Sequence, residues 1–152
     1  MRIYVTEDYQ AMSRKVANLL AAQVMMKPDC VLGLATGSTP VGAYQRLVEL
    51  YRAGDVDFSQ VRSINLDEYV GLAPTHDQSY RYFMQSNLFD HVNIDPANTN
   101  VPQGLAEDPE AECRRYNQVI HDLGPIDLQL LGMGHNGHIG FNEPSDVFVR
   151  ET

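Results

Sequence analysis

The sequence predicts an α/β fold with a doubly wound, mostly parallel sheet and helices on both faces. Short apolar runs with the composition of buried strands alternate with stretches whose apolar residues recur at helical spacing. Polar clusters follow three of these strands, at the edge where open α/β sheets bind their ligands. With 43% hydrophobic residues and no repeat or linker, residues 1–152 are expected to form a single domain. The alternation stops after Glu143, so we expect this domain to lack its C-terminal portion.

Four segments are predicted to be strands because they are short, apolar and rich in β-favouring residues: 2–5, 30–35, 61–66 and 126–131. Segment 93–103 contains two prolines and three asparagines and is predicted to be irregular. Because helical stretches separate the strands, the strands are expected to run mostly parallel.

Two helices are predicted in the first half of the chain. The first is capped by Thr6 or Asp8 and should end before Pro28, because the residue preceding a proline avoids helical angles. The second carries an apolar stripe that begins at Val41, and Gly54 is well placed to end it.

Two more helices are predicted in the second half, at residues 79–88 and 109–123. The second of these has clear boundary signals: Asp108 as the cap, Pro109 at the first helical position and Gly124 after the end.

Composition limits the partners that the protein is expected to have. A net charge of −9 argues against nucleic acid or an anionic membrane surface. No apolar run approaches the length of a membrane span, and the N-terminus does not resemble a signal peptide, so we expect a cytoplasmic protein. Cys30 and Cys113 form neither a metal-binding spacing nor a disulfide framework and are interpreted as reduced thiols.

The polar turn after the second predicted strand has the features of an anion-binding site. Thr36, Gly37, Ser38 and Thr39 offer hydroxyls and backbone N–H groups beside the positive end of a helix dipole. The turn matches neither the Walker loop nor the dinucleotide-binding fingerprint. The alternative is a tight turn whose hydroxyls only cap the helix.

Adjacent carboxylates, Asp67 and Glu68, follow the third predicted strand. One of them can act as a general base if its surroundings adjust its pKa. Because successive side chains of a strand point to opposite sides, at most one of the two should face a site. The alternative is solvated loop charge.

The loop after the last predicted strand holds four glycines, His135, His138, Asn136 and Glu143. Two histidines three residues apart suggest a metal, but no third ligand is evident, and metal binding is disfavoured. His138 is instead a candidate for proton transfer near neutral pH, with Glu143 to orient it. The alternative is a loop histidine whose ring is satisfied by a backbone carbonyl.

Four stretches together closely resemble the glucosamine-6-phosphate deaminase (glucosamine-6-phosphate isomerase) family: LGLATGSTPVGAY, NLDEYVGL, DQSYRYFM and LLGMGHNGHIGFNEP. The resemblance covers essentially all of the chain, and family members are longer by roughly a third of their length. It implies a Rossmann-like fold of the phosphosugar-isomerase type. It also implies an aldose–ketose isomerisation coupled to deamination, in which glucosamine 6-phosphate and water give fructose 6-phosphate and ammonia.

Roles follow from the resemblance residue by residue. Asp67 corresponds to the base that moves a proton from C2 to C1, and His138 to the group that opens the sugar ring, with Asn136 and Glu143 as its partners. Residues 36–39 correspond to the phosphate-binding turn, and Gly137 to a further substrate contact. The family's basic phosphate ligands correspond to positions after Thr152. No metal or organic cofactor is implied.

One position departs from part of the family, because some members carry Asp where this chain has Asn136. An Asn orients an imidazole but cannot stabilise imidazolium with charge, so Glu143 would supply that charge alone. Two rivals stay open: a 6-phosphogluconolactonase-like hydrolase and a non-catalytic sensor of hexosamine phosphates. The family includes monomers and allosterically activated hexamers, so a homo-oligomer is also left open.

Overall fold

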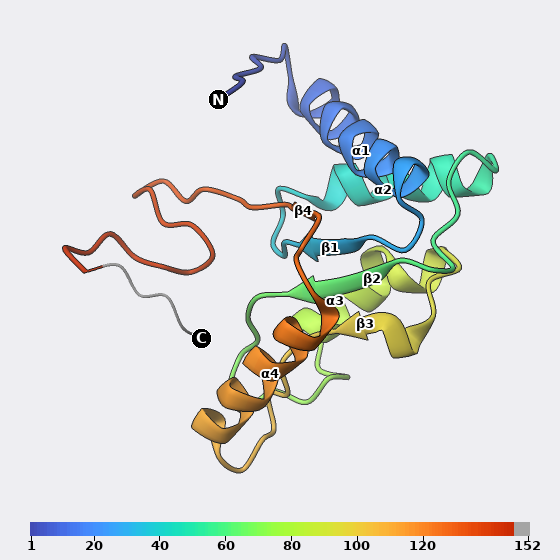
Figure 1. Ribbon diagram of the computed structural model, residues 1–152. Coiled ribbons are helices and arrows are strands. Elements are labelled where there is room, and N and C mark those ends of the chain that lie inside the picture. Colours follow the sequence, from blue (N-terminus) through green and yellow to red (C-terminus); the bar gives the residue numbers. More distant parts are fainter. Residues whose placement is uncertain (148–152) are drawn as a thin grey trace.

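The computed structural model describes residues 1–147 and contains a four-stranded, all-parallel sheet in the order β3-β2-β1-β4 (Figure 1). The strands are β1 Val31–Leu34, β2 Arg62–Asn65, β3 Thr99–Asn100 and β4 Leu128–Gln129. The central pair, β1 and β2, is fully in register from Val31 opposite Arg62 to Leu34 opposite Asn65. The predicted α/β fold class is confirmed.

The helices are α1 Tyr9–Met26, α2 Val41–Arg52, α3 Tyr80–Asn87 and α4 Pro109–Leu123, with 3₁₀ turns at Phe89–His91 and Pro96–Asn98. Three of the four start at a side-chain cap: Asp8 accepts from the Ala11 N–H, Ser79 from Tyr82 and Asp108 from Ala111. The predicted helices are therefore confirmed, and α4 has the predicted bounds. No helix in the described range 1–147 is long and apolar enough to cross a membrane.

The core lies on both faces of the sheet. Side chains of α1, α2 and α3 pack with Leu32 and Leu34 on one face, and α1 lies beside α2 (Figure 1). On the other face Tyr116 of α4 packs with Val31 and Ile64. Neighbouring residues of β1 thus point to opposite faces, as buried parallel strands require.

The prediction of a strand at residues 2–5 is wrong. This segment has no regular structure, and Ile3 and Val5 are 75% and 95% exposed. Figure 1 shows it leading away from the helices. A strand exists only beside a partner that takes up its backbone hydrogen bonds, and within residues 1–147 no segment pairs with this one.

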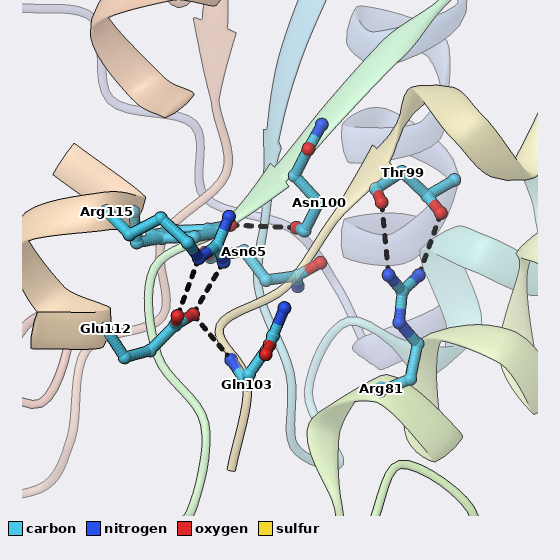
Figure 2. A network of polar contacts seen from close by, with 8 residues as sticks. Asn65, Arg81, Thr99, Asn100, Gln103, Glu112 and Arg115 are labelled. Carbon is cyan, nitrogen blue, oxygen red and sulfur yellow. Dashed lines mark hydrogen bonds and ion pairs between the residues drawn. The ribbon is translucent and has the colours of Figure 1, made fainter. Parts of the chain in front are cut away.

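The prediction that segment 93–103 is irregular is wrong at Thr99–Asn100, which form β3, and at the 3₁₀ turn Pro96–Asn98, whereas residues 93–95 and 101–103 have no regular structure. Side chains fix this short strand: Arg81 donates to the hydroxyl and carbonyl of Thr99 (Figure 2), and Asn100 Nδ2 donates to the Ser63 carbonyl. The Tyr116 hydroxyl lies 2.7 Å from the carbonyl of Asn65 and 2.9 Å from that of Asn100. These contacts come from elements distant in sequence, so local composition did not predict them.

The predicted strand at 126–131 is confirmed but shorter, since only Leu128 and Gln129 are assigned to β4. Its start is held by Asp127, which accepts from the Val31 N–H and pairs with Lys27 at 2.8 Å. The Leu130 N–H still donates to Gly33, and the chain then leaves the sheet. That departure begins the loop that carries the histidines.

Candidate functional site

A cavity of about 410 Å³ opens at the carboxyl ends of β1 and β2. Its lining combines residues 36–40, Asp67 and a part of the last loop that includes His138. The polar groups that follow three separate strands therefore do converge. Among the described residues that line the cavity there is no Lys or Arg.

The turn between β1 and α2 is open to a ligand. Gly37 has φ +91°, and Ser38 and Thr39 are exposed. Pro40 is the N-cap of α2 and provides no side-chain hydrogen bond to it. Within the described chain α2 therefore starts without a side-chain cap from this turn.

Tyr9, which the sequence analysis did not single out, fixes this turn from α1. Its hydroxyl accepts from the Gly42 N–H at 2.8 Å and lies 3.0 Å from the Thr39 carbonyl, to which it donates. Gly42 allows α1 and α2 to approach this closely, because a Cβ at this position would lie 2.5 Å from Ser13 Oγ. The pairing spans 33 residues, and no local pattern in the sequence signals it.

Asp67 is the carboxylate that faces the cavity. It is half-buried, and its pKa is raised, first by burial and then by the negative charge of Glu68. Glu68 points elsewhere and does not line the cavity. The expectation that at most one of the two carboxylates faces the site is met, and neither is simply solvated.

Tyr80 of α3 also lines the cavity, although the sequence analysis gave it no role. Its hydroxyl donates to that of Tyr69 at 3.1 Å, and Thr36 lines the cavity beside it. Burial raises its pKa, followed by the bond to Tyr69, so the phenol stays protonated. The DQSYRYFM stretch that carried part of the resemblance contains this residue and was the available signal.

The imidazole of His138 is held by two side chains of its own loop. His138 Nδ1 lies 2.8 Å from Asn136 Oδ1 and 3.5 Å from Glu143 Oε1, and Asn136 Nδ2 donates to Glu143. Two oxygen acceptors at Nδ1 assign the proton of the neutral ring to that nitrogen. The ring is thus satisfied by side chains and not by a backbone carbonyl. Nε2 is engaged by neither partner.

Phe141 and Gly134 complete the surroundings of the imidazole. The ring of Phe141 stacks on that of His138 with centroids 5.9 Å apart. A Cβ on Gly134 would lie 2.3 Å from His138 Cε1, so this glycine makes room for the ring. Phe141 has φ +61°, a conformation that is costly for a residue with a side chain and that directs its ring here.

The other candidate residues of the loop lie outside the cavity lining. Asn136 and Glu143 contact His138 at Nδ1. Gly137 forms an exposed turn with φ +89°, and His135 is also exposed. In the range 1–147 no group of three or more His, Cys, Asp or Glu side chains is placed to hold a metal ion. The arrangement can therefore bind an anion at the turn, remove a proton from a carbon atom with Asp67, and exchange a second proton with His138.

Comparison with known proteins connects this geometry to a family. The family model described as glucosamine-6-phosphate isomerases/6-phosphogluconolactonase matches residues 6–140. The glucosamine-6-phosphate deaminase of Lachnoclostridium phytofermentans is 61% identical over 152 residues, which is 100% of this chain and 64% of that protein. The deaminase of Clostridium perfringens is 60% identical over 97% of this chain and 61% of its own length. The chain thus spans less than two thirds of these relatives.

Solved structures show the same relationship. A monomeric glucosamine-6-phosphate deaminase superposes with a TM-score of 0.93 and 44% identity, over 95% of this chain and 60% of that one. The 6-phosphogluconolactonase of Thermotoga maritima superposes with a TM-score of 0.75 and 23% identity, over 90% of this chain and 61% of that one. The second likeness shows the shared fold alone.

Proposed function

The chain belongs to the family of glucosamine-6-phosphate isomerases and 6-phosphogluconolactonases, and we propose that its protein is a glucosamine-6-phosphate deaminase. The reaction converts glucosamine 6-phosphate and water to fructose 6-phosphate and ammonia, in cytoplasmic amino-sugar catabolism. The observation that carries the proposal is one cavity that unites an open polar turn, a half-buried carboxylate and a histidine oriented by side chains.

The turn at residues 36–39 is assigned to the phosphate. Its hydroxyls and the N-terminus of α2 supply hydrogen bonds and a partial positive charge. Because the described lining has no Lys or Arg, these groups alone would bind a dianion weakly. The proposal therefore includes basic ligands at positions after Thr152, as the family resemblance implies.

Asp67 is assigned as the base. It takes the proton from C2 of the open-chain amino aldose, and an enolamine with a cis-enediol-type geometry forms between C1 and C2. Return of the proton to C1, with the proton that O1 gains balanced by one that the amino nitrogen releases, gives a C2 imine, which water hydrolyses to the ketose and ammonia. A carboxylate with a raised pKa is a stronger base than a solvated one, and a fixed position over one face allows both transfers.

His138 is assigned to ring opening. In the closed sugar the bond between C1 and the ring oxygen must break, and the ring oxygen must gain a proton. Nδ1 is occupied by Asn136 and Glu143, so Nε2 exchanges that proton. Glu143 stabilises the imidazolium form by charge, whereas Asn136 orients the ring. Gly137 shapes the turn that carries Asn136 and His138.

The test is ammonia release from glucosamine 6-phosphate by this chain and by the full-length product of its gene. Hydrolysis of 6-phosphogluconolactone is measured in parallel, since that reaction needs no base over C2. Ammonia release by the full-length protein supports the deaminase. Lactone hydrolysis without ammonia would transfer the assignment to the lactonase. Saturable binding of the amino sugar phosphate without turnover would favour the sensor.

A further inference from the structure

We propose that Glu68 is a positioning residue, whose carboxylate ties the Asp67 segment to the N-terminus of α3 and so fixes Asp67 and Tyr80 relative to each other. Glu68 touches neither the cavity nor the reacting atoms and would act through these two neighbours. The inference rests on the proposed function for its kinetic consequence, while its structural part can be tested independently.

The Glu68 carboxylate takes up two donors of the first turn of α3. Oε1 accepts from the Tyr80 N–H at 2.9 Å, and Oε2 accepts from the Arg81 N–H at 3.0 Å. The third free donor, the Tyr82 N–H, goes to Ser79 Oγ at 3.0 Å. The N–H groups at a helix start have no partner within the helix, and a carboxylate there also interacts favourably with the helix dipole. A side chain 12 residues earlier in the chain thus completes the cap.

The same carboxylate shapes its own segment, since Oε1 also accepts from the Tyr69 N–H at 2.8 Å. Gly104 packs against the other side: a Cβ there would lie 2.5 Å from the Tyr69 carbonyl oxygen and 3.3 Å from Glu68 Cγ. The Gly71 N–H donates to the Gly104 carbonyl at 2.7 Å. The segment after β2 is therefore held from both sides, and Asp67 lies one peptide bond from this fixed point.

Tyr80 completes the link to the cavity. Its backbone is bound by Glu68, and its side chain lines the cavity together with Asp67. Loss of the Glu68 contact would free the start of α3, and the position of the Tyr80 phenol relative to Asp67 would then no longer be fixed. A displacement of about 1 Å at a catalytic base is enough to cost roughly 100-fold in rate.

Charge supplies a second effect of Glu68. In the described chain, the charged or titratable groups around Asp67 are Glu68 beside it, Tyr80 and His138, which line the cavity with it, and Glu112 and Cys113, which line a smaller hollow with it. Glu68 itself faces Arg81 of α3, and it shares a hollow of about 150 Å³ with Glu112 and Cys113 of α4. The negative charge of Glu68 raises the pKa of Asp67, so its removal should lower that pKa.

The experiment compares Glu68→Gln, which removes the charge at constant size, with Glu68→Asp, which keeps the charge and shortens the reach. The full-length protein is used, and Glu110→Gln is the matched control at the exposed first turn of α4. Glu68→Gln should lower kcat by about tenfold with KM changed less than threefold. It should also move the acidic limb of the pH profile to lower pH. Glu68→Asp should lower kcat while leaving that limb in place. A merely structural role would lower kcat in both variants without this difference in the pH profile.

Two measurements do not depend on activity. Amide exchange at Tyr80 and Arg81 should be faster in both Glu68 variants than in Glu110→Gln, and the carboxyl carbon of Asp67 should titrate at lower pH in Glu68→Gln. Unchanged amide exchange together with unchanged Asp67 titration would overturn the inference. If the unsubstituted protein releases no ammonia, the proposed function fails, and these two measurements still decide the role of Glu68.

Discussion

The two sides of the cavity are built differently. On one side, residues 36–40 and Asp67 extend from β1 and β2, whose residues are almost all buried. On the other, His138 lies in a loop in which Met133 and Phe141 are 72% and 60% exposed. Figure 1 shows this loop, in orange to red, projecting beyond the sheet. The sheet side takes its geometry from the core, whereas the loop side takes it from a few contacts of its own.

This difference separates the chemistry that each side can provide. The sheet side can bury a carboxylate and raise its pKa, because the surrounding atoms are fixed by packing. The loop side orients an imidazole through Asn136, Glu143 and the stacked Phe141. The backbone of this loop is held by two isolated β-bridges, from Ile139 to Met133 and to Asn142. Substitutions on the loop should therefore change single steps of the reaction, and substitutions behind the sheet should change stability first.

The largest effect is expected on the sheet side, from Asp67→Asn. The amide cannot accept the C2 proton, so proton exchange at C2 should fall by about 10⁴-fold while sugar-phosphate binding stays nearly intact. Exchange is followed by deuterium incorporation from solvent, and binding by calorimetry. Asp77→Asn, in an exposed loop, is the matched control. Normal exchange in Asp67→Asn would refute the assignment of the base.

The next effect is expected on the loop side, from His138→Gln. Turnover of the closed-ring substrate should fall by about 100-fold, because the ring oxygen loses its proton donor. An analogue without hydroxyls at C4 and C5 cannot cyclise and should be much less affected. His135→Gln, exposed and outside the cavity lining, is the control. Equal losses on both substrates would contradict a role in ring opening.

The sequence predicted the sheet side of the site better than its supports. Residues 36–39 and Asp67 follow strands that their apolar runs predict, and the edge of a parallel sheet brings these residues together. Glu68 was expected to be the carboxylate that does not face the site, but nothing local indicated that it binds α3. Tyr9 was missed for the same reason, since its partner lies on another helix.

The errors in the fold have a related cause. Segment 2–5 has the alternating, β-rich pattern of a strand, yet a pattern cannot provide the partner that a strand needs. Thr99 and Asn100 have the reverse situation, because their composition favours a turn and contacts from Arg81, Ser63 and Tyr116 make them a strand. Where tertiary contacts outweigh local propensity, sequence patterns mislead in both directions.

The smallest effect on activity is expected from Glu112→Gln, and its comparison with Glu143→Gln gives the clearest contrast between the two sides. Glu112 is 8% exposed behind the sheet, where it binds Arg115 and accepts from the Gln103 N–H at 2.8 Å (Figure 2). Glu143, on the loop, is 62% exposed and binds Asn136 and His138. Glu112→Gln should lower the free energy of unfolding by about 1–2 kcal/mol and leave activity within threefold. Glu143→Gln should lower activity by more than about threefold and leave the free energy of unfolding nearly unchanged.

The pH dependence of unfolding distinguishes the two further. Arg115, followed by the Gln103 N–H, holds the pKa of Glu112 below its usual range. The stability from Glu112 is therefore complete above the ordinary carboxyl pKa of about 4.3 and is lost as the pH falls through the lower folded value. Urea unfolding at several pH values should show Glu112→Gln converging with the unsubstituted protein in acid, with Glu110→Gln as the control. A difference that persists at low pH would mean that packing, and not charge, is what Glu112 contributes.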